Sequence, residues 1–233
     1  MTSLNKNLPL RWHTFATTDD LERAAVQTIL RAAREAITRR GTFLIVLAGG
    51  TTPRKVYELL RQADADWRAW QVYFGDERCL PPIHAERNSR MAALAWLDHV
   101  PIPRDQIHVI HAEAGAETAA ADYTRRLNQI AMFDLVLLGL GEDGHTASLF
   151  PGHDHGTTHA APAAMPVHDA PKLPPDRVSL SALRLSASRQ VVFLVTGEAK
   201  RQTVRDWRNG VNIPAAAITP ASGADVYVEA ALL

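Results

Sequence analysis

The stretch FDLVLLGLGEDGHTAS (Phe133–Ser148) joins a strongly apolar run to three glycines, two acids and a histidine. Apart from Asp134, the run up to Leu138 is apolar, and a short run of this kind is typical of a strand buried on both faces of a sheet. The glycines that follow predict a tight turn at the end of that strand. Their spacing, G-x-G-x-x-G, also occurs where a dinucleotide binds, so this stretch bears on both the fold class and the kind of site.

Strands and helices alternate on both sides of this stretch. Further apolar runs predict strands over residues 42–48, 71–75, 107–110, 190–196 and 226–228. Apolar residues at helical spacing predict helices over residues 19–40, 53–62, 87–97, 116–129 and 198–207. The alternation indicates an α/β protein with a mostly parallel sheet and helices on both faces. Because no linker divides the chain, residues 1–233 are expected to form a single domain.

One segment, Gly152–Asp176, breaks the alternation. It is rich in Pro, His, Ala and Gly, and a connection of this length without secondary structure is often functional or mobile. Its histidines, with Asp154, suggest a metal site, but their spacing is not that of a closed set of ligands: His153, His155 and His159. We therefore expect no metal here.

The composition is that of an ordinary folded protein, with 46% hydrophobic and 21% charged residues. Lys and Arg together number 25, as do Asp and Glu, so bulk charge favours neither nucleic acid nor a membrane as a partner. No apolar run reaches the roughly 18 residues of a membrane span, and Met1–Trp12 lacks the apolar core of a signal peptide. The single cysteine, Cys79, fits a reducing compartment. We expect a cytoplasmic protein and, in the absence of a self-association stripe, a monomer.

Asp143 and His145 decide between a nucleotide site and a catalytic one. A dinucleotide fold needs an acid at the end of the next strand, about 20 residues on, to bind a ribose, and here the Pro- and His-rich segment stands in that place. Histidine moves protons near neutral pH, and a neighbouring carboxylate selects its tautomer. The glycine turn is therefore interpreted as catalytic. The alternative is an Asp that caps a helix beside a solvated His.

Polar groups follow two other predicted strands. Gly49-Gly50-Thr51 ends one strand and opens a helix, where free N–H groups attract an anion, although the Lys-Ser/Thr pair of a P-loop is missing. Asp76 and Arg78 end the next strand, where Asp76 could orient a proton carrier and Arg78 could bind a phosphate. The alternatives are a tight turn and a surface ion pair. Cys79 beside Arg78 could have a lowered pKa, but no base is evident for a nucleophile.

Five blocks stand in a set order along residues 43–205: Gly49-Gly50-Thr51-Thr52-Pro53; Gly75-Asp76-Glu77-Arg78 with Asn88-Ser89 downstream; GLGEDGHTASLFP from Gly139 to Pro151; Arg177-Val178-Ser179-Leu180; and Gly197 with Lys200. In this order they resemble the 6-phosphogluconolactonase family, whose superfamily includes glucosamine-6-phosphate deaminase. The resemblance implies a Rossmann-like fold and hydrolysis of 6-phospho-D-glucono-1,5-lactone to 6-phospho-D-gluconate, the second step of the oxidative pentose phosphate pathway. It implies no metal, nucleotide or other cofactor.

The resemblance also implies roles for individual residues. His145 would take a proton from the water that attacks the lactone carbonyl and return it to the departing ring oxygen. Either Asp76 or Asp143 would orient His145, and both assignments stay open. Backbone N–H groups of a glycine turn would stabilise the oxyanion. The substrate phosphate would be held by a further set of residues: Gly49, Gly50, Thr51, Arg78, Arg177 and Lys200.

Two other functions are compatible with the same blocks. The first is that of a sugar-phosphate isomerase or deaminase, but the deaminases carry a catalytic glutamate just before a proline, where this chain has Phe150 before Pro151. The second is that of a sugar-phosphate sensor without catalysis, and the intact pair Asp143 and His145 counts against it. Lactone hydrolysis is therefore the favoured expectation.

Overall fold

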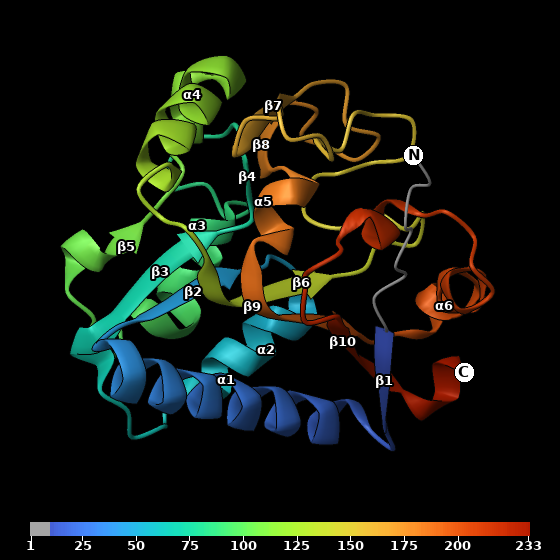
Figure 1. The fold of residues 1–233 in the computed structure, drawn as a ribbon, viewed down its shortest axis with the longest axis horizontal. Coiled ribbons are helices and arrows are strands. Elements are labelled where there is room, and N and C mark those ends of the chain that lie inside the picture. Colours follow the sequence, from blue (N-terminus) through green and yellow to red (C-terminus); the bar gives the residue numbers. More distant parts are fainter. Residues whose placement is uncertain (1–9) are drawn as a thin grey trace, which may run out of the picture.

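Seven parallel strands form one sheet within residues 10–233, the part of the chain that the computed structural model describes (Figure 1). The strand order is β1-β10-β9-β6-β2-β3-β5. The bounds are β1 Leu10–Phe15, β2 Phe43–Leu47, β3 Trp70–Phe74, β5 Ile107–His108, β6 Phe133–Gly139, β9 Ser188–Val195 and β10 Ala224–Glu229. A second, antiparallel sheet has the order β4-β8-β7, with β4 Asp76–Arg78, β7 Ala164–Val167 and β8 Arg177–Leu180.

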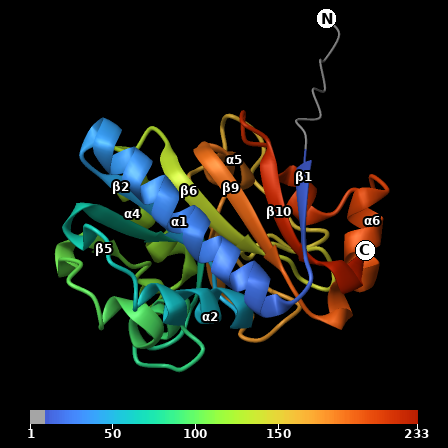
Figure 2. The ribbon, with the colours of Figure 1, turned by 90° about the horizontal axis from the view of Figure 1, so that it is seen from below.

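Helices cover both faces of the parallel sheet. Their bounds are α1 Thr18–Arg40, α2 Thr51–Leu60, α3 Asn88–Ala92, α4 Ala116–Leu127, α5 Ala182–Ser186 and α6 Arg201–Arg208. In Figure 1, α1 and α2 lie below the sheet and α4 and α5 above it, and in Figure 2 α1 crosses in front of the strands. Thr28 of α1 shares a hydrogen bond with Tyr227, whereas Trp207 of α6 packs edge-on against Trp12 and Phe193. Trp12 is in register with Val226, which directly precedes Tyr227 on β10, and successive residues of a strand point to opposite faces of the sheet. Helices α1 and α6 therefore lie on opposite faces of the sheet.

The apolar run of the opening stretch forms the central strand, β6. Its residues from Phe133 to Leu138 are all buried, and even Asp134 is covered. Fully burying one leucine or phenylalanine side chain stabilises a fold by about 1.5–3 kcal/mol, so this run is far more stable inside the sheet than at its edge. The order in which strands are added also reverses here, because successive strands are added toward β5 after β2 and toward β1 after β6. The crevice between the carboxyl ends of β2 and β6 is therefore where an α/β sheet binds its ligand.

The α/β class, the parallel sheet, and the helices on both faces are all confirmed. The predicted strands and helices are present with boundaries displaced by a few residues, as with β10, which is longer than expected, and β5, which is shorter. The helix expected over 87–97 is α-helical only to Ala92 and ends in a wider turn over Ala93–Leu97. The helix α1 begins where expected, with Thr17 capping the N–H of Asp20, and it ends at Gly41 in a left-handed conformation.

Other elements differ from the expectation. The strand β1 was not predicted, because an edge strand half open to solvent lacks a continuous apolar run. The segment Gly152–Asp176, expected to lack secondary structure, contains β7, which pairs with β8. Strand β4 leaves β3 after Gly75 alone and pairs with β8, so that Asp76 lies opposite Ser179 and Arg78 opposite Arg177. This second sheet places two separate blocks of polar residues over the carboxyl ends of the main strands.

Two expectations concern the chain's relation to membranes. Within the described residues, no helix is both long and apolar enough to cross a bilayer. The other expectation, that Met1–Trp12 is not a signal peptide, falls mostly on residues 1–9, which lie outside the described residues.

Candidate functional site

A cavity of about 590 Å³ opens at the carboxyl ends of the central strands. The last residues of β2 and β6 line it, as expected for a ligand site at the point where the strand order reverses. The cavity brings together eight of the nine residues selected from the sequence: Gly49, Gly50, Thr51, Asp76, Arg78, His145, Arg177 and Lys200. The ninth, Asp143, contacts His145.

Asp143 and His145 form a pair on the turn after β6. The Asp143 carboxylate and the Nδ1 of His145 are hydrogen-bonded, and Oδ1 also accepts the His145 backbone N–H at 3.2 Å. A proton on Nδ1 leaves Nε2 free to accept another proton. Burial lowers the pKa of His145 below its ordinary value, although the hydrogen bond and charge of Asp143 act in the opposite direction. Burial would raise the pKa of Asp143, but hydrogen bonding to His145 and its charge hold that pKa below its ordinary value.

The glycine at position 141 makes room for this pair. A Cβ atom there would lie 1.9 Å from Nδ1 of His145 and 2.6 Å from Oδ1 of Asp143. The backbone also turns sharply, since Gly144 has a φ of 83° and Ala147 a φ of 49°. A left-handed alanine costs roughly 1–2 kcal/mol, so the rest of the turn must hold it in place. The G-x-G-x-x-G spacing therefore serves to place a histidine and an acid.

The hydrogen-bond partners of Asp76 do not include His145, the proton carrier that the sequence suggested for it. Its carboxylate is only 5% exposed and accepts hydrogen bonds from Oγ of Ser148 at 2.7 Å and from Nδ2 of Asn88 at 3.0 Å. No contact joins it directly to His145, although its negative charge raises the pKa of that histidine from a distance. Since Ser148 is on the same turn as His145, Asp76 ties that turn to β4. Asp143, and not Asp76, is thus the carboxylate in contact with His145.

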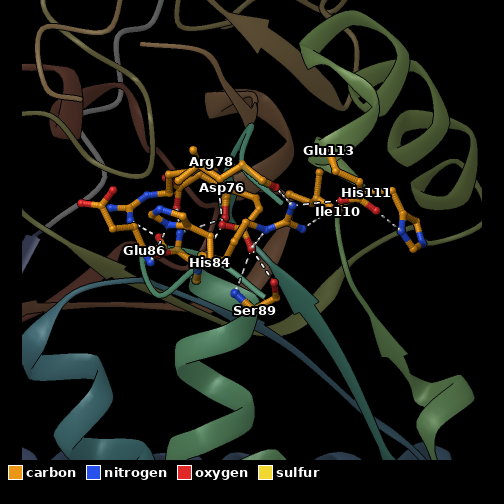
Figure 3. A network of polar contacts seen from close by, with 12 residues as sticks. Asp76, Arg78, His84, Glu86, Ser89, Ile110, His111 and Glu113 are labelled. Carbon is orange, nitrogen blue, oxygen red and sulfur yellow. Dashed lines mark hydrogen bonds and ion pairs between the residues drawn. The ribbon is translucent and has the colours of Figure 1, made fainter. Parts of the chain in front are cut away.

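The neighbouring Glu77 anchors the base of the site, and Figure 3 shows Asp76 and Ser89 within the surrounding network of polar contacts. It is fully buried and accepts the backbone N–H groups of Asn88 at 2.7 Å and Ser89 at 2.8 Å, which begin α3. Its charge is balanced by Arg87, 2% exposed, whose Nε lies 3.1 Å from Oε2. A carboxylate at a helix N-terminus stabilises the helix dipole. Glu77 therefore holds in place the helix that presents Asn88 to Asp76.

The turn from β2 to α2 lies against the same network. An ideal Cβ on Gly49 would be 2.0 Å from Oδ1 of Asn88, so only glycine fits. Gly50, with a φ of 104°, precedes α2 and gives it no side-chain cap. The first residues of α2, Thr51 and Thr52, line the cavity, and the backbone N–H groups at a helix N-terminus attract anions.

The three basic residues from the sequence differ in how their charges are used. The Nε of Arg78 is buried without a hydrogen-bond partner among residues 10–233, while one of its terminal nitrogens donates to the carbonyl of Glu86. Lys200 lies 3.8 Å from Glu142, and burial lowers its pKa. Arg177 is 4% exposed and donates to backbone carbonyls of the loop before it, and burial lowers its pKa as well.

Two other sequence hypotheses concern reactive groups. Burial raises the pKa of the Cys79 thiol to about 11, so the lowered pKa suggested by the neighbouring Arg78 is wrong. In the part of the chain that the structure describes, no three His, Cys, Asp or Glu side chains are grouped closely enough to bind a metal. His155 instead shares a hydrogen bond with the carbonyl of Phe150.

Sequence reasoning missed several residues of the site, among them Lys172 and Thr196. Lys172 lines the cavity from the segment Gly152–Asp176, and Thr196 lines it from the end of β9. The only sequence signal for Lys172 was its place as the one lysine of that segment, five residues before Arg177. The Ser148–Asp76 hydrogen bond was also unforeseen, because it joins residues 72 positions apart.

Comparisons with known proteins identify relatives of this chain. A 6-phosphogluconolactonase from Synechocystis sp. is 39% identical over 193 residues, 79% of this chain and 78% of the relative. The rat enzyme of the same name is 34% identical over 226 residues, 90% of this chain and 87% of the relative. The crystal structure of the Thermotoga maritima 6-phosphogluconolactonase has a TM-score of 0.87 at 25% identity and covers 95% of this chain and 100% of its own. The family described as glucosamine-6-phosphate isomerases/6-phosphogluconolactonase matches residues 16–227, and the chain belongs to that family.

Proposed function

We propose that this protein hydrolyses 6-phospho-D-glucono-1,5-lactone to 6-phospho-D-gluconate, the second step of the oxidative pentose phosphate pathway. The observation that carries the proposal is the Asp143–His145 pair beside a cavity that also holds basic side chains and the N-terminus of α2. Hydrolysis of a phosphorylated lactone requires a base for the attacking water and an anion site for the phosphate. The catalytic pair is suited to the first requirement, and the basic side chains with the helix N-terminus are suited to the second. The similarity of the chain to several 6-phosphogluconolactonases supports the same reaction.

In the proposed mechanism His145 is both base and acid. Its Nε2 takes a proton from water as the water oxygen bonds to the lactone carbonyl carbon. The ring C–O bond then breaks, and the same proton passes to the departing ring oxygen. Asp143 keeps the other ring nitrogen protonated and stabilises the imidazolium between the two steps. No covalent intermediate with the protein is required, because a lactone is already an activated ester.

The phosphate is proposed to lie between the start of α2 and the basic side chains. The guanidinium of Arg78 and the ammonium of Lys200, which both line the cavity, supply charge, and the turn Gly49–Thr51 supplies backbone donors. Arg177 adds positive charge to the same cavity. Asp76 acts by holding the catalytic turn through Ser148.

One observation separates this function from deamination on the same fold. Phe150 is fully buried, and its ring centroid lies 4.8 Å from that of His145. An apolar ring therefore occupies the position where the deaminases carry a glutamate. Ammonia release from glucosamine 6-phosphate would overturn the assignment.

The direct test is lactone opening on fresh substrate, with the uncatalysed rate subtracted and a chelator present. We expect wild type to accelerate opening and His145→Ala to reduce kcat/KM by about 10²–10⁴-fold, the usual contribution of a general base. His99→Ala is the matched control, because His99 is on the surface and shares a hydrogen bond with the carbonyl of Leu94. A His145→Ala rate near that of wild type would remove His145 from the mechanism. A protein that binds 6-phosphogluconate without opening the lactone would be a sensor.

We also propose that the enzyme works as a cytoplasmic monomer with a small-molecule substrate and no nucleic-acid or membrane partner. The balanced charge and the single cysteine support this. Light scattering on the purified protein tests the monomer.

A further inference from the structure

The loop before β8 forms part of the cavity wall, and a buried arginine holds it there. Arg177 uses Nη2 to donate to the carbonyls of Lys172 at 2.7 Å and Leu173 at 3.2 Å, and Nε to donate to that of Pro174 at 3.0 Å. Its Cζ lies 5.4 Å from the centre of the Phe150 ring. With two of its three nitrogens bonded to the loop backbone, this guanidinium sets the position of the loop relative to β8.

The side chain of Lys172 lies on the rim of the same cavity. It is exposed and lines the cavity together with His145 and Lys200. Within residues 10–233, its ammonium has no hydrogen bond and no carboxylate at ion-pair distance, unlike Lys55 on α2, which pairs with Glu58 at 2.9 Å. The charge of Lys172 is therefore available to a ligand.

Two ammonium groups and an imidazole thus converge on one space. The charge of Lys172 contributes to lowering the pKa of Lys200 and of His145, in each case after the larger effect of burial. The nearest carboxylate to Lys200 is that of Glu142, at the edge of ion-pair range. Like charges around one cavity repel one another, and a bound dianion would attract both ammonium groups.

We propose that Lys172 binds the phosphate of the substrate together with Lys200, and that Arg177 is a positioning residue that holds Lys172 through the loop carbonyls. This inference rests on the proposed function, since it assigns residues to the phosphate of that substrate. It also gives the segment Gly152–Asp176 a role, because this segment carries Lys172, a residue that binds the phosphate, to a cavity formed mainly by the ends of strands.

The first experiment compares the phosphorylated lactone with unphosphorylated glucono-1,5-lactone. Lys172→Gln should raise KM for the phosphorylated substrate roughly 10- to 100-fold, the loss of one charge-assisted hydrogen bond. At a pH above the acidic limb, it should change kcat/KM for the unphosphorylated lactone less than about twofold. Lys172→Arg keeps the charge and should stay within a few-fold of wild type. Lys55→Gln removes a lysine outside the cavity and should change nothing.

A pH profile adds a readout that a purely structural role would not move. The charged groups that act on His145 are Asp143, Asp76 and Lys172. Removing the positive charge of Lys172 lets His145 hold its proton more tightly, so its pKa rises. Because the neutral imidazole is the working base, the acidic limb of kcat/KM should move to higher pH in Lys172→Gln.

A double mutant separates positioning from direct contact. If Arg177 acts only through Lys172, then Arg177→Met combined with Lys172→Gln should raise KM no further than Lys172→Gln alone. Multiplying effects would mean that Arg177 touches the phosphate itself and would overturn its positioning role. Should Arg177→Met fail to fold, the Lys172 variants decide the phosphate assignment alone.

The outcomes also separate this inference from the proposed function. A wild-type protein that opens the lactone, with unchanged KM and pH profile in Lys172→Gln, overturns the inference and leaves the function intact. A wild-type protein that does not open the lactone overturns the function. Calorimetric titration with 6-phosphogluconate then tests Lys172 by itself, and equal affinities for wild type and Lys172→Gln would overturn the inference.

Discussion

Replacing Asp143 with asparagine keeps the shape of the catalytic pair and removes its charge. A hydrogen bond to a charged group contributes about 1.5–3 kcal/mol, and 1.36 kcal/mol corresponds to a tenfold change in rate. The full loss therefore corresponds to roughly 10- to 150-fold in kcat/KM. Because the Asp143 side chain is 33% exposed and water replaces part of the interaction, we expect the lower part of this range, about 10- to 50-fold.

The same substitution should displace the pH profile in a defined direction. The charge of Asp143 raises the pKa of His145 against the stronger effect of burial, so its removal lowers that pKa further. Activity requires neutral His145 and is lost below its pKa. The acidic limb of kcat/KM should thus move to lower pH in Asp143→Asn, opposite to the shift expected for Lys172→Gln.

The assay is the initial rate of lactone opening across the pH range, with the uncatalysed rate subtracted at each pH. Asp64→Asn is the matched control, since Asp64 is an exposed carboxylate in the loop after α2. An Asp143→Asn enzyme within twofold of wild type, with an unmoved acidic limb, would refute the coupling between the two side chains. A shift to higher pH would refute the assigned sign of the Asp143 effect.

Three further substitutions test the surroundings of the pair. Gly141→Ala should reduce kcat/KM by about 100-fold with an unchanged circular dichroism spectrum, because its Cβ would lie 1.9 Å from His145; a near-normal rate would show that the turn yields freely. Ser148→Ala should reduce the free energy of unfolding by about 2 kcal/mol, or roughly 4–8 °C in Tm, because buried Asp76 loses a partner, and a shift below about 1 °C in calorimetry would contradict this. Arg78→Ala should raise KM for the phosphorylated lactone about tenfold or more with little change in kcat, and an unchanged KM would place the phosphate elsewhere.

Where structure depends on local pattern, the sequence was a reliable guide. The apolar run of β6 could only be stable in the middle of the sheet. Helix α1 begins after its cap Thr17 and ends before Gly41, because capping depends on residues that are neighbours in the chain. The pair of Asp143 and His145 was also visible, since its members are two residues apart on one turn. Strand β1 was missed because its stability comes from pairing with β10, more than 200 residues away.

The sequence by itself thus determined the alternating fold, the crevice at the strand ends and the residue types that gather there. Only the tertiary structure decided which carboxylate contacts His145, because Asp76 is held by Ser148 and Asn88 from other parts of the chain. It likewise bonded Arg177 to loop carbonyls and placed Lys172 at the cavity without an ion-pair partner among residues 10–233. The hydrogen-bond partners of a long side chain are the groups that folding brings within about 3 Å of it, and the order of residues along the chain does not specify which groups these are.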